Sequence, residues 1–295
     1  MASGIRKLLQ DLSVLRSYRA AKAGRFPLSI RLPFVRNRIR HLAHETWPGG
    51  YVFSSAGDLM YVPSPVDHSG GYRLLKPDAP SPFIDAICKP DDVFIDVGAN
   101  VGNWTLAAAR AVGKGGRVLA FEPVPRVAET LRKTVKANRL QQVKVFEMAL
   151  AEASGTRPFS VESPNTGGSR LGAMSDDPSR FFEHIHVTTG KLDEVAHTEH
   201  LSRVDVIKID VEGFEYAVLQ GTQAVLNRFK PALILETGHE NAQSRAGIER
   251  LLAPIGYGIV GVLVGHGLLE ASWGDYSAQE GVFRELALAD LLLMV

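Results

Sequence analysis

The sequence predicts an α/β fold in which helices cover both faces of a mainly parallel sheet, and two observations lead to that prediction. From residue 91 onward, short apolar runs alternate with longer stretches of helical periodicity. Strands that alternate with helices form parallel sheets, and their apolar runs are nearly continuous because both faces are buried. The composition agrees: of 295 residues, 45% are hydrophobic and 22% are charged, which suits a globular chain with a sizeable core.

Seven apolar runs are expected to be the strands of this sheet. They lie, in chain order, at residues 92–97, 117–122, 143–148, 204–210, 232–237, 257–264 and 291–295. Helices are expected at residues 103–112, 125–140, 214–229 and 242–256, after the first, second, fourth and fifth strands. In the second helix Val127, Leu131 and Val135 fall on one face, which is the spacing of an amphipathic helix.

Two segments interrupt the alternation. Residues 1–80 are rich in proline and glycine, and we expect them to form a basic, helical or irregular N-terminal cap on a main domain of residues 81–295. Residues 151–203 are too long for a simple crossover between the third and fourth strands. A short hairpin or lid over the functional site is expected there.

The N-terminal segment carries most of the positive charge. Residues 1–40 hold ten cations and one acid, so this segment is +9 and the total of +1 leaves −8 for the remainder. The segment predicts a basic amphipathic helix packed on the main domain, and the alternative is a helix that contacts an anionic membrane or an acidic partner. The sequence has no membrane-spanning run and no signal-peptide core, so we expect a cytoplasmic protein. If the basic helix contacts an anionic membrane, the protein would lie at the inner face of that membrane.

The loop "DVGANVG", Asp96 to Gly102, joins the first strand to the first helix and predicts a nucleotide site. Ligands of open α/β sheets bind beyond the carboxyl ends of the strands, and glycines let the backbone approach them closely. A dinucleotide fingerprint would have its second glycine where Asn100 stands, and the carboxylate of Asp96 would repel a pyrophosphate. S-adenosylmethionine carries a sulfonium and an ammonium but no phosphate, so the charge favours that cofactor.

Glu122 ends the second strand, 20 residues after Gly102. A carboxylate at this place can accept hydrogen bonds from both ribose hydroxyls of a nucleoside. It does not by itself separate a nicotinamide cofactor from S-adenosylmethionine, so the distinction rests on the Asp96 loop. The alternative structural role of Glu122 is to cap the following helix.

Three stretches, "FIDVGANVGNWTLAAA", "VLAFEPVP" and "IKIDVEGFEYAVLQG", together resemble the FkbM-type methyltransferases, which are class I, S-adenosylmethionine-dependent enzymes. The resemblance covers about residues 80–237. It implies a Rossmann-like seven-stranded mixed sheet in the order 3-2-1-4-5-7-6, with the last strand antiparallel. It also implies O-methylation of a hydroxyl on a sugar, glycan or polyketide-like small molecule. "NTGGSRL" resembles the family's Gly-Ser-Ser-Leu stretch, but Arg170 replaces one serine.

The resemblance implies roles for individual positions near the cofactor. Gly98, Asn100 and Gly102 would line its methionine end, and Asp96 would support their loop. Glu122 would hold the ribose. The resemblance further implies that Met148 and Ala149 flank the adenine and that Asp210 faces the methyl or amino group.

The chemistry of methyl transfer to a hydroxyl needs an aligned acceptor and a proton acceptor. The candidates for catalysis are Asp210, Lys208, Glu212 and His239, which cluster in "KIDVEGFE" and "LETGHE" at the ends of the fourth and fifth strands. Lys208 could neutralise these acids or bind a negatively charged acceptor. The sequence leaves open whether Glu215 has a catalytic role or anchors the loop.

No metal is expected in the site. The four histidines at 184, 186, 197 and 200 have no carboxylate or cysteine partner at zinc-ligand spacing. A magnesium ion held by Asp210, Glu212 and Glu236 is the alternative, since that ion prefers oxygen ligands.

Two other functions remain open beside the methyltransferase. One is a nicotinamide-dependent oxidoreductase, which Asp96 and the missing middle glycine disfavour. The other is a non-catalytic module that binds the cofactor and is recruited through its basic N-terminus. We expect no nucleic-acid partner, because the main part of the chain is acidic and no base-flipping motif follows the fourth strand.

Overall fold

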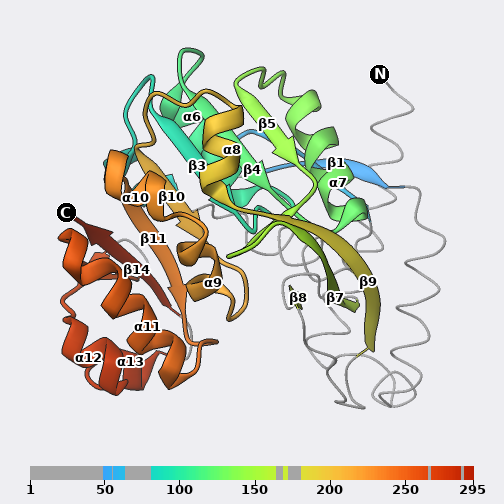
Figure 1. Cartoon of the computed structure of the whole chain (residues 1–295). Coiled ribbons are helices and arrows are strands. Elements are labelled where there is room, and N and C mark those ends of the chain that lie inside the picture. The colour runs from blue at the N-terminus through green and yellow to red at the C-terminus, as the bar shows by residue number, and fades with distance from the viewer. Residues whose placement is uncertain are drawn as a thin grey trace, which may run out of the picture.

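The computed structural model describes residues 49–54, 56–63, 81–163, 169–171, 181–264, 267–286 and 289–295. Among these residues a central sheet of eight strands runs in the order β13-β12-β14-β11-β10-β3-β4-β5 (Figure 1). The strands are β3 (Val93–Val97), β4 (Arg117–Phe121), β5 (Val143–Phe146), β10 (Val206–Ile209), β11 (Ala232–Thr237), β12 (Gly258–Val264), β13 (Gly267–Leu269) and β14 (Ala289–Met294). The five strands from β5 to β11 pair in parallel, whereas β14 is antiparallel to both of its neighbours.

Each of the seven expected runs forms a strand of this sheet. Read from β5 to β12, the strands occupy the order 3-2-1-4-5-7-6, and the last of the seven, β14, is the antiparallel one. The eighth strand, β13, was not predicted. It has three residues, all of them exposed, and a segment this short at a sheet edge carries no periodic signal.

Helices cover both faces of the central sheet, as predicted. They are α5 (Ser81–Ile87), α6 (Asn103–Val112), α7 (Pro125–Ala137), α8 (Leu192–Thr198), α9 (Glu215–Gln220), α10 (Gln223–Phe229), α11 (Ala242–Leu252), α12 (Trp273–Ala278) and α13 (Val282–Glu285). Successive side chains of a strand point to opposite faces. Accordingly Ile95 of β3 lies in one core cluster with Ile248 of α11, and Phe94 lies in another with Ile84 of α5.

The single helix expected over residues 214–229 is wrong, because the structure divides it into α9 and α10. A Cβ atom at Gly221 would lie 2.1 Å from the carbonyl oxygen of Ala151, so only glycine allows the chain to approach there. The amides of Ala224 and Val225 donate to the carboxylate of Asp193, at 3.0 and 2.9 Å. These bonds satisfy N–H groups at the start of a new helix.

Part of the expected N-terminal cap forms a β-hairpin, which corrects the prediction of a helical or irregular segment there. Strands β1 (Gly50–Phe53) and β2 (Leu59–Val62) pair in antiparallel. The hairpin rests on α7, since the amide of Leu59 donates to Asn138 Oδ1 at 2.9 Å and the amide of Tyr61 donates to Thr134 Oγ1 at 3.0 Å. Residues 1–48 and 64–80, including the basic segment, lie outside the described residues, so their roles remain predictions.

A second sheet occupies the long segment after β5, where a short hairpin or lid was expected. Its four strands are β6 (Ala149–Leu150), β7 (Gly155–Ser163), β8 (Arg170–Leu171) and β9 (Phe181–Gly190), in the order β6-β9-β7-β8 (Figure 1). Val161 and Val187 of this sheet lie in one apolar cluster with Val101 and Val124, from the loops that follow β3 and β4. The second sheet therefore packs against the predicted cofactor loop.

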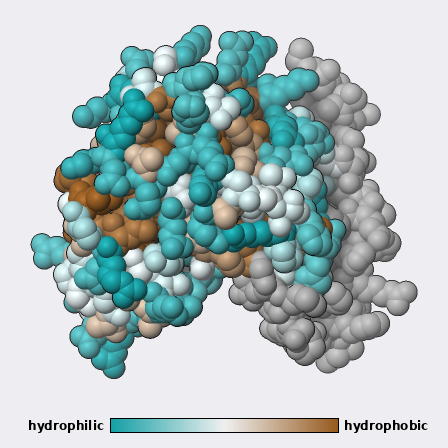
Figure 2. All heavy atoms as spheres, viewed as in Figure 1, coloured by the Kyte–Doolittle hydropathy of each residue, from teal (hydrophilic) through white to brown (hydrophobic). Residues whose placement is uncertain are grey.

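No helix among the described residues is long and apolar enough to cross a membrane. Hydrophilic side chains cover most of the viewed face, with an apolar area near the C-terminal end of the chain (Figure 2).

Candidate functional site

The loops that follow β3, β4, β10 and β11 meet at one edge of the central sheet. These strands are parallel neighbours, so their carboxyl ends share that edge. Such an edge is where open α/β sheets bind their ligands. Apart from Met148 and Ala149, the predicted site residues lie on these strands or loops, so the structure brings the predicted cofactor residues and the predicted catalytic residues to one edge.

The glycine loop after β3 is fastened to both neighbouring strands. The amides of Gly98 and Ala99 donate to the carbonyl of Phe121 in β4, at 3.1 and 2.9 Å. Gly98 has a φ of +77°, and a Cβ atom there would lie 1.9 Å from the carbonyl oxygen of Asp210, which follows β10. Only glycine combines this backbone conformation with so close an approach.

Replacing Gly98 with alanine is therefore expected to destabilise the fold by about 3 kcal/mol or more, because the clash with a backbone carbonyl adds to the backbone strain. Gly57 is a matched control, since it has a φ of +86° and no atom within 4 Å of an added Cβ. Gly57→Ala should cost only about 1 kcal/mol. Denaturant unfolding of both variants measures the difference, and equal losses would contradict the close approach.

Glu122 ties the loop after β4 to the glycine loop. Its Oε1 accepts from the amide of Val124 at 2.9 Å, and its Oε2 accepts from the amide of Asn100 at 3.0 Å. Glu122 is 6% exposed, and this burial raises its pKa to about 7 despite the two amide donors. The Oδ1 atom of Asn100 is also buried and has no hydrogen-bond partner in the described part of the chain.

Lys208 of β10 lies beneath the site between two carboxylates. Its ammonium donates to Asp210 Oδ2 at 2.9 Å and lies 3.8 Å from Asp96 Oδ1. Burial opposes the charged ammonium, but Asp210 and Asp96 outweigh it and hold the pKa of Lys208 above its ordinary value. Lys208 is 1% exposed. Of its two predicted roles, the structure therefore supports neutralising the acids rather than contacting an acceptor.

Asp96 is tied to α6, the helix that follows the glycine loop. Its side chain is fully buried, and its Oδ2 accepts from the hydroxyl of Thr105 in α6 at 2.5 Å. Burial raises the pKa of Asp96, against the lowering effects of Lys208 and Thr105. Thr105 was not predicted as a site residue, and a threonine one turn into a helix gives no distinctive sequence signal.

Asp210 and Glu236 form a carboxyl pair at the ends of β10 and β11. Burial and the charge of Asp210 raise the pKa of Glu236. Although burial opposes it, Asp210 has a pKa below its ordinary value, because Lys208 attracts its charge and Glu236 shares a hydrogen bond with it. Asp210 remains 32% exposed, so it can face a ligand.

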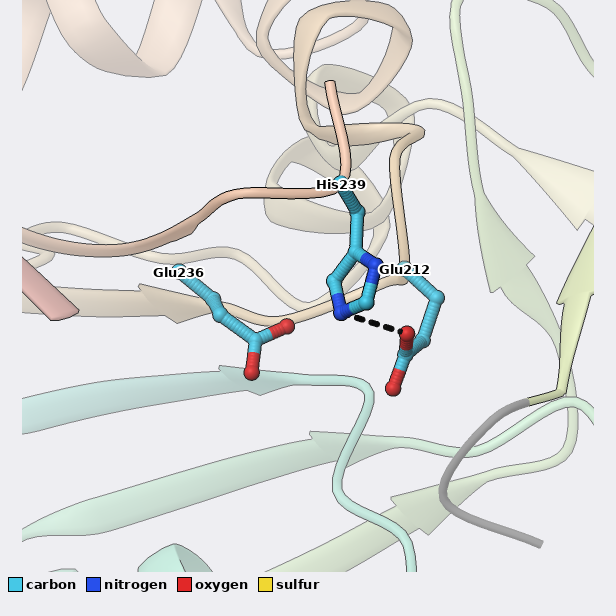
Figure 3. Close-up of side chains that lie close together, drawn as sticks. All are labelled: Glu212, Glu236 and His239. Carbon is cyan, nitrogen blue, oxygen red and sulfur yellow. Dashed lines mark ion pairs between the residues drawn. The ribbon is translucent and has the colours of Figure 1, made fainter. Parts of the chain in front are cut away.

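Glu212 and His239 meet beside this pair. Figure 3 shows the imidazole of His239 lying between the carboxylates of Glu212 and Glu236. His239 Nε2 lies 2.9 Å from Glu212 Oε2, and this contact raises the pKa of His239. His239 is 33% exposed. It is therefore not an isolated surface histidine but part of a polar cluster at the sheet edge.

Glu215 anchors the loop after β10. Its Oε1 accepts from the amides of Val211 and Gly213, at 3.2 and 3.1 Å. The side chain is 1% exposed, and burial raises its pKa to about 7. Of the two roles left open by the sequence, the structure supports the anchor.

Met148 and Ala149 lie beyond the end of β5, which stops at Phe146 rather than at residue 148. Ala149 is buried in β6 and pairs with Thr189 of β9. A Cβ atom at Gly190 would lie 2.3 Å from Met148 Cε, so Met148 packs against β9. Their contact with an adenine ring stays a prediction.

Asp290 is an acidic residue of the site that sequence reasoning missed. It stands opposite Glu236 in the β11–β14 pairing, and burial raises its pKa to about 6. The sequence offered one indication of Asp290, which is an acid directly before the apolar run "LLLMV". Only the antiparallel pairing of the last strand brings it to Glu236.

Comparisons with known proteins agree with this geometry. A family model described as the methyltransferase FkbM domain matches residues 96–257. The chain is 27% identical over 199 residues to methyltransferase sdnD of Sordaria araneosa, which covers 58% of this chain and 75% of that protein. It is 27% identical over 157 residues to the 2-O-methyltransferase NoeI of Sinorhizobium fredii, covering 50% of this chain and 63% of that protein.

Two further similarities are to a curated relative and to a solved structure. The chain is 27% identical over 160 residues to the 31-O-demethyl-FK506 methyltransferase FkbM of Streptomyces tacrolimicus, covering 46% of this chain and 61% of that protein. A solved structure of a methyltransferase FkbM from Methylobacillus flagellatus aligns with a TM-score of 0.44 and 14% identity, over 90% of this chain and 61% of that one.

Proposed function

The chain belongs to the methyltransferase FkbM domain family, and we propose that it transfers a methyl group from S-adenosylmethionine to a hydroxyl of a sugar, glycan or polyketide-like small molecule. Two relatives are named for methylation of oxygen, which supports a hydroxyl acceptor. The aligned regions cover less than two thirds of those two relatives, so their substrates are a guide to class only.

The observation that carries the proposal is the negative character of the cofactor edge. Asp96 and Glu122 are buried beside a loop that has no basic side chain of its own, and Glu122 already organises that loop through the amide of Asn100. The buried ammonium of Lys208 is shared between Asp96 and Asp210, so the carboxylates still outnumber the cation. A pyrophosphate would meet carboxylates there, whereas a sulfonium and an ammonium are attracted to them. The charge therefore favours S-adenosylmethionine over a dinucleotide.

The residues present fit this cofactor. Each oxygen of Glu122 uses one lone pair on an amide and keeps another for a ribose hydroxyl. The buried, unpartnered Oδ1 of Asn100 can accept a hydrogen bond from a ligand at the glycine loop. Asp210 is partly exposed and would face the amino group. When bound, the cofactor supplies a methyl group made electrophilic by the sulfonium.

The acceptor side of the proposal rests on the polar cluster of Asp210, Glu212, Glu236 and His239. These residues lie at the ends of β10 and β11, next to the loop that would hold the cofactor. Lys208 keeps Asp210 ionised, and Glu215 holds the backbone that carries Glu212. A hydroxyl entering here would find oriented acceptors for its proton, which is what general-base assistance requires.

Calorimetric titration with S-adenosylhomocysteine and, separately, with NADH tests the cofactor. We expect binding of the first ligand only, followed by transfer from a labelled methyl donor to a hydroxyl acceptor in a screen. Binding of NADH alone would replace the proposal with an oxidoreductase. Binding of S-adenosylhomocysteine without transfer to any acceptor would favour the non-catalytic module.

The affinity for S-adenosylhomocysteine is expected to depend on pH through Glu122. Its pKa of about 7 in the free protein means that it is protonated below neutrality, and ribose hydroxyls are accepted best by the ionised form. Binding should therefore tighten as pH rises through 7 and level off above it, by up to about tenfold per pH unit below the pKa. Calorimetry from pH 6 to 8 measures this, and Glu122→Gln should flatten the profile. A wild-type profile as flat as that of the variant would exclude this role.

A further inference from the structure

We propose that Glu212, Glu236 and His239 form a binding site for one divalent cation, of the kind that accepts both carboxylate and imidazole ligands. One ligand atom from each residue lies within 4.8 Å of the other two. The sequence led to an expectation of no metal, with a magnesium ion held by Asp210, Glu212 and Glu236 as the alternative. The structure instead commits Asp210 to Lys208 at 2.9 Å and brings His239 into the set.

The three side chains converge from two loops and a strand. Glu236 lies in β11, His239 follows that strand, and Glu212 follows β10 (Figure 3). The separation of 2.9 Å between His239 Nε2 and Glu212 Oε2 matches two neighbouring ligands around one ion, since bonds of about 2.1 Å at right angles place ligand atoms about 3 Å apart.

One oxygen of the proposed ligand set is buried without a hydrogen-bond partner among the described residues. Glu236 Oε2 has no hydrogen-bond partner in the described part of the chain and is inaccessible to solvent. Asp290 stands opposite Glu236 in the β11–β14 pairing, and Asp210 shares a hydrogen bond with Glu236. Lys208 is the buried cation beside them. Buried polar atoms are nearly always satisfied, and a cation bound at this acid-rich place would satisfy this oxygen.

The loops that carry the ligands lie close against each other. The amide of Gly213, next to Glu212, donates to Glu215. Gly213 has a φ of +99°, and a Cβ atom there would lie 3.2 Å from the carbonyl oxygen of His239. Ligands on fixed backbone bind metals better than ligands on mobile loops, because less order is lost on binding.

The cation site deepens the proposed function, because it would lie at the acceptor side of the cleft. Three protein ligands leave coordination positions open, and hydroxyl oxygens of an acceptor can fill them. A bound cation also stabilises the negative charge that develops on such an oxygen. This role rests on the proposed function, whereas binding of the cation does not.

Titration of the chelator-treated full chain with Mn²⁺ tests the site, with free Mn²⁺ followed by electron paramagnetic resonance. We expect one ion per chain, and at least tenfold weaker binding in His239→Asn and in Glu212→Gln. His197→Asn is the matched control, since His197 is an exposed histidine on α8, and it should bind as the wild type does. Both site residues are partly exposed, so these variants should unfold at the wild-type temperature.

The result that would overturn the cation site is no saturable Mn²⁺ binding by the wild type, or binding that the two site variants leave unchanged. S-adenosylhomocysteine binding is measured on the same samples. If that ligand binds while Mn²⁺ does not, only the cation site is excluded. If Mn²⁺ binds while S-adenosylhomocysteine does not, the cation site stands and the methyltransferase proposal fails.

Discussion

Glu122→Ala is expected to weaken binding of S-adenosylhomocysteine by at least about 100-fold. A hydrogen bond to a charged group contributes about 1.5–3 kcal/mol, and two ribose hydroxyls would lose their acceptor. The substitution also frees the amides of Asn100 and Val124, which Glu122 holds in place. Pre-organisation of the glycine loop is therefore lost together with the direct contacts.

Calorimetry of the purified variant measures this effect, with thermal unfolding as a check on the fold. Glu147→Ala is a matched control, because Glu147 also follows a strand of the central sheet, β5. It is, however, 40% exposed and pairs with Arg132 at the surface. It should bind as the wild type does. If Glu122→Ala bound S-adenosylhomocysteine with wild-type affinity while remaining folded, the cofactor would have to lie elsewhere.

Lys208→Met is expected to lower the free energy of unfolding by about 3–5 kcal/mol, because removing one partner of a buried ion pair leaves the other charge uncompensated. Here the effect involves two carboxylates, those of Asp96 and Asp210. Methionine keeps the apolar length of the side chain, so the loss reports the charge rather than a cavity.

Denaturant unfolding measures this loss against Lys144→Met. Lys144 also forms an ion pair, with Glu199, but it is 56% exposed, and such surface pairs contribute at most about 1 kcal/mol. Adding Asp210→Asn to Lys208→Met should recover part of the lost stability, since one of the unpaired charges disappears. A Lys208→Met variant no less stable than Lys144→Met would mean that the buried acids are neutralised by other means.

Much of the fold could be predicted from local pattern. Strands β3, β4, β10 and β11 are continuous apolar runs because both of their faces are buried, and such runs are visible without knowledge of their neighbours. The break between α9 and α10 was missed, because it depends on the carbonyl of Ala151 pressing on Gly221. That contact joins distant parts of the chain and leaves no periodic trace.

The residues of the candidate site also divide into those that the sequence could indicate and those that it could not. Asp96, Gly98 and Glu122 could be identified because strand ends and glycine loops are local features, and the edge they share follows from parallel pairing. The role of Lys208 could not be decided from its position alone. Its burial between Asp96 and Asp210 turns a candidate acceptor contact into a structural counter-charge.

The sequence by itself determined the alternation of strands and helices, the acidic glycine loop and the acid at the end of the second strand, because burial, backbone freedom and charge are properties of short segments. Only the tertiary structure decided that His239 meets Glu212 and Glu236, and that Asp290 stands opposite Glu236. These contacts depend on strand order, register and the packing of loops against one another. The pKa and the binding capacity of a side chain depend on the groups around it, and the fold determines which groups from distant parts of the chain lie there.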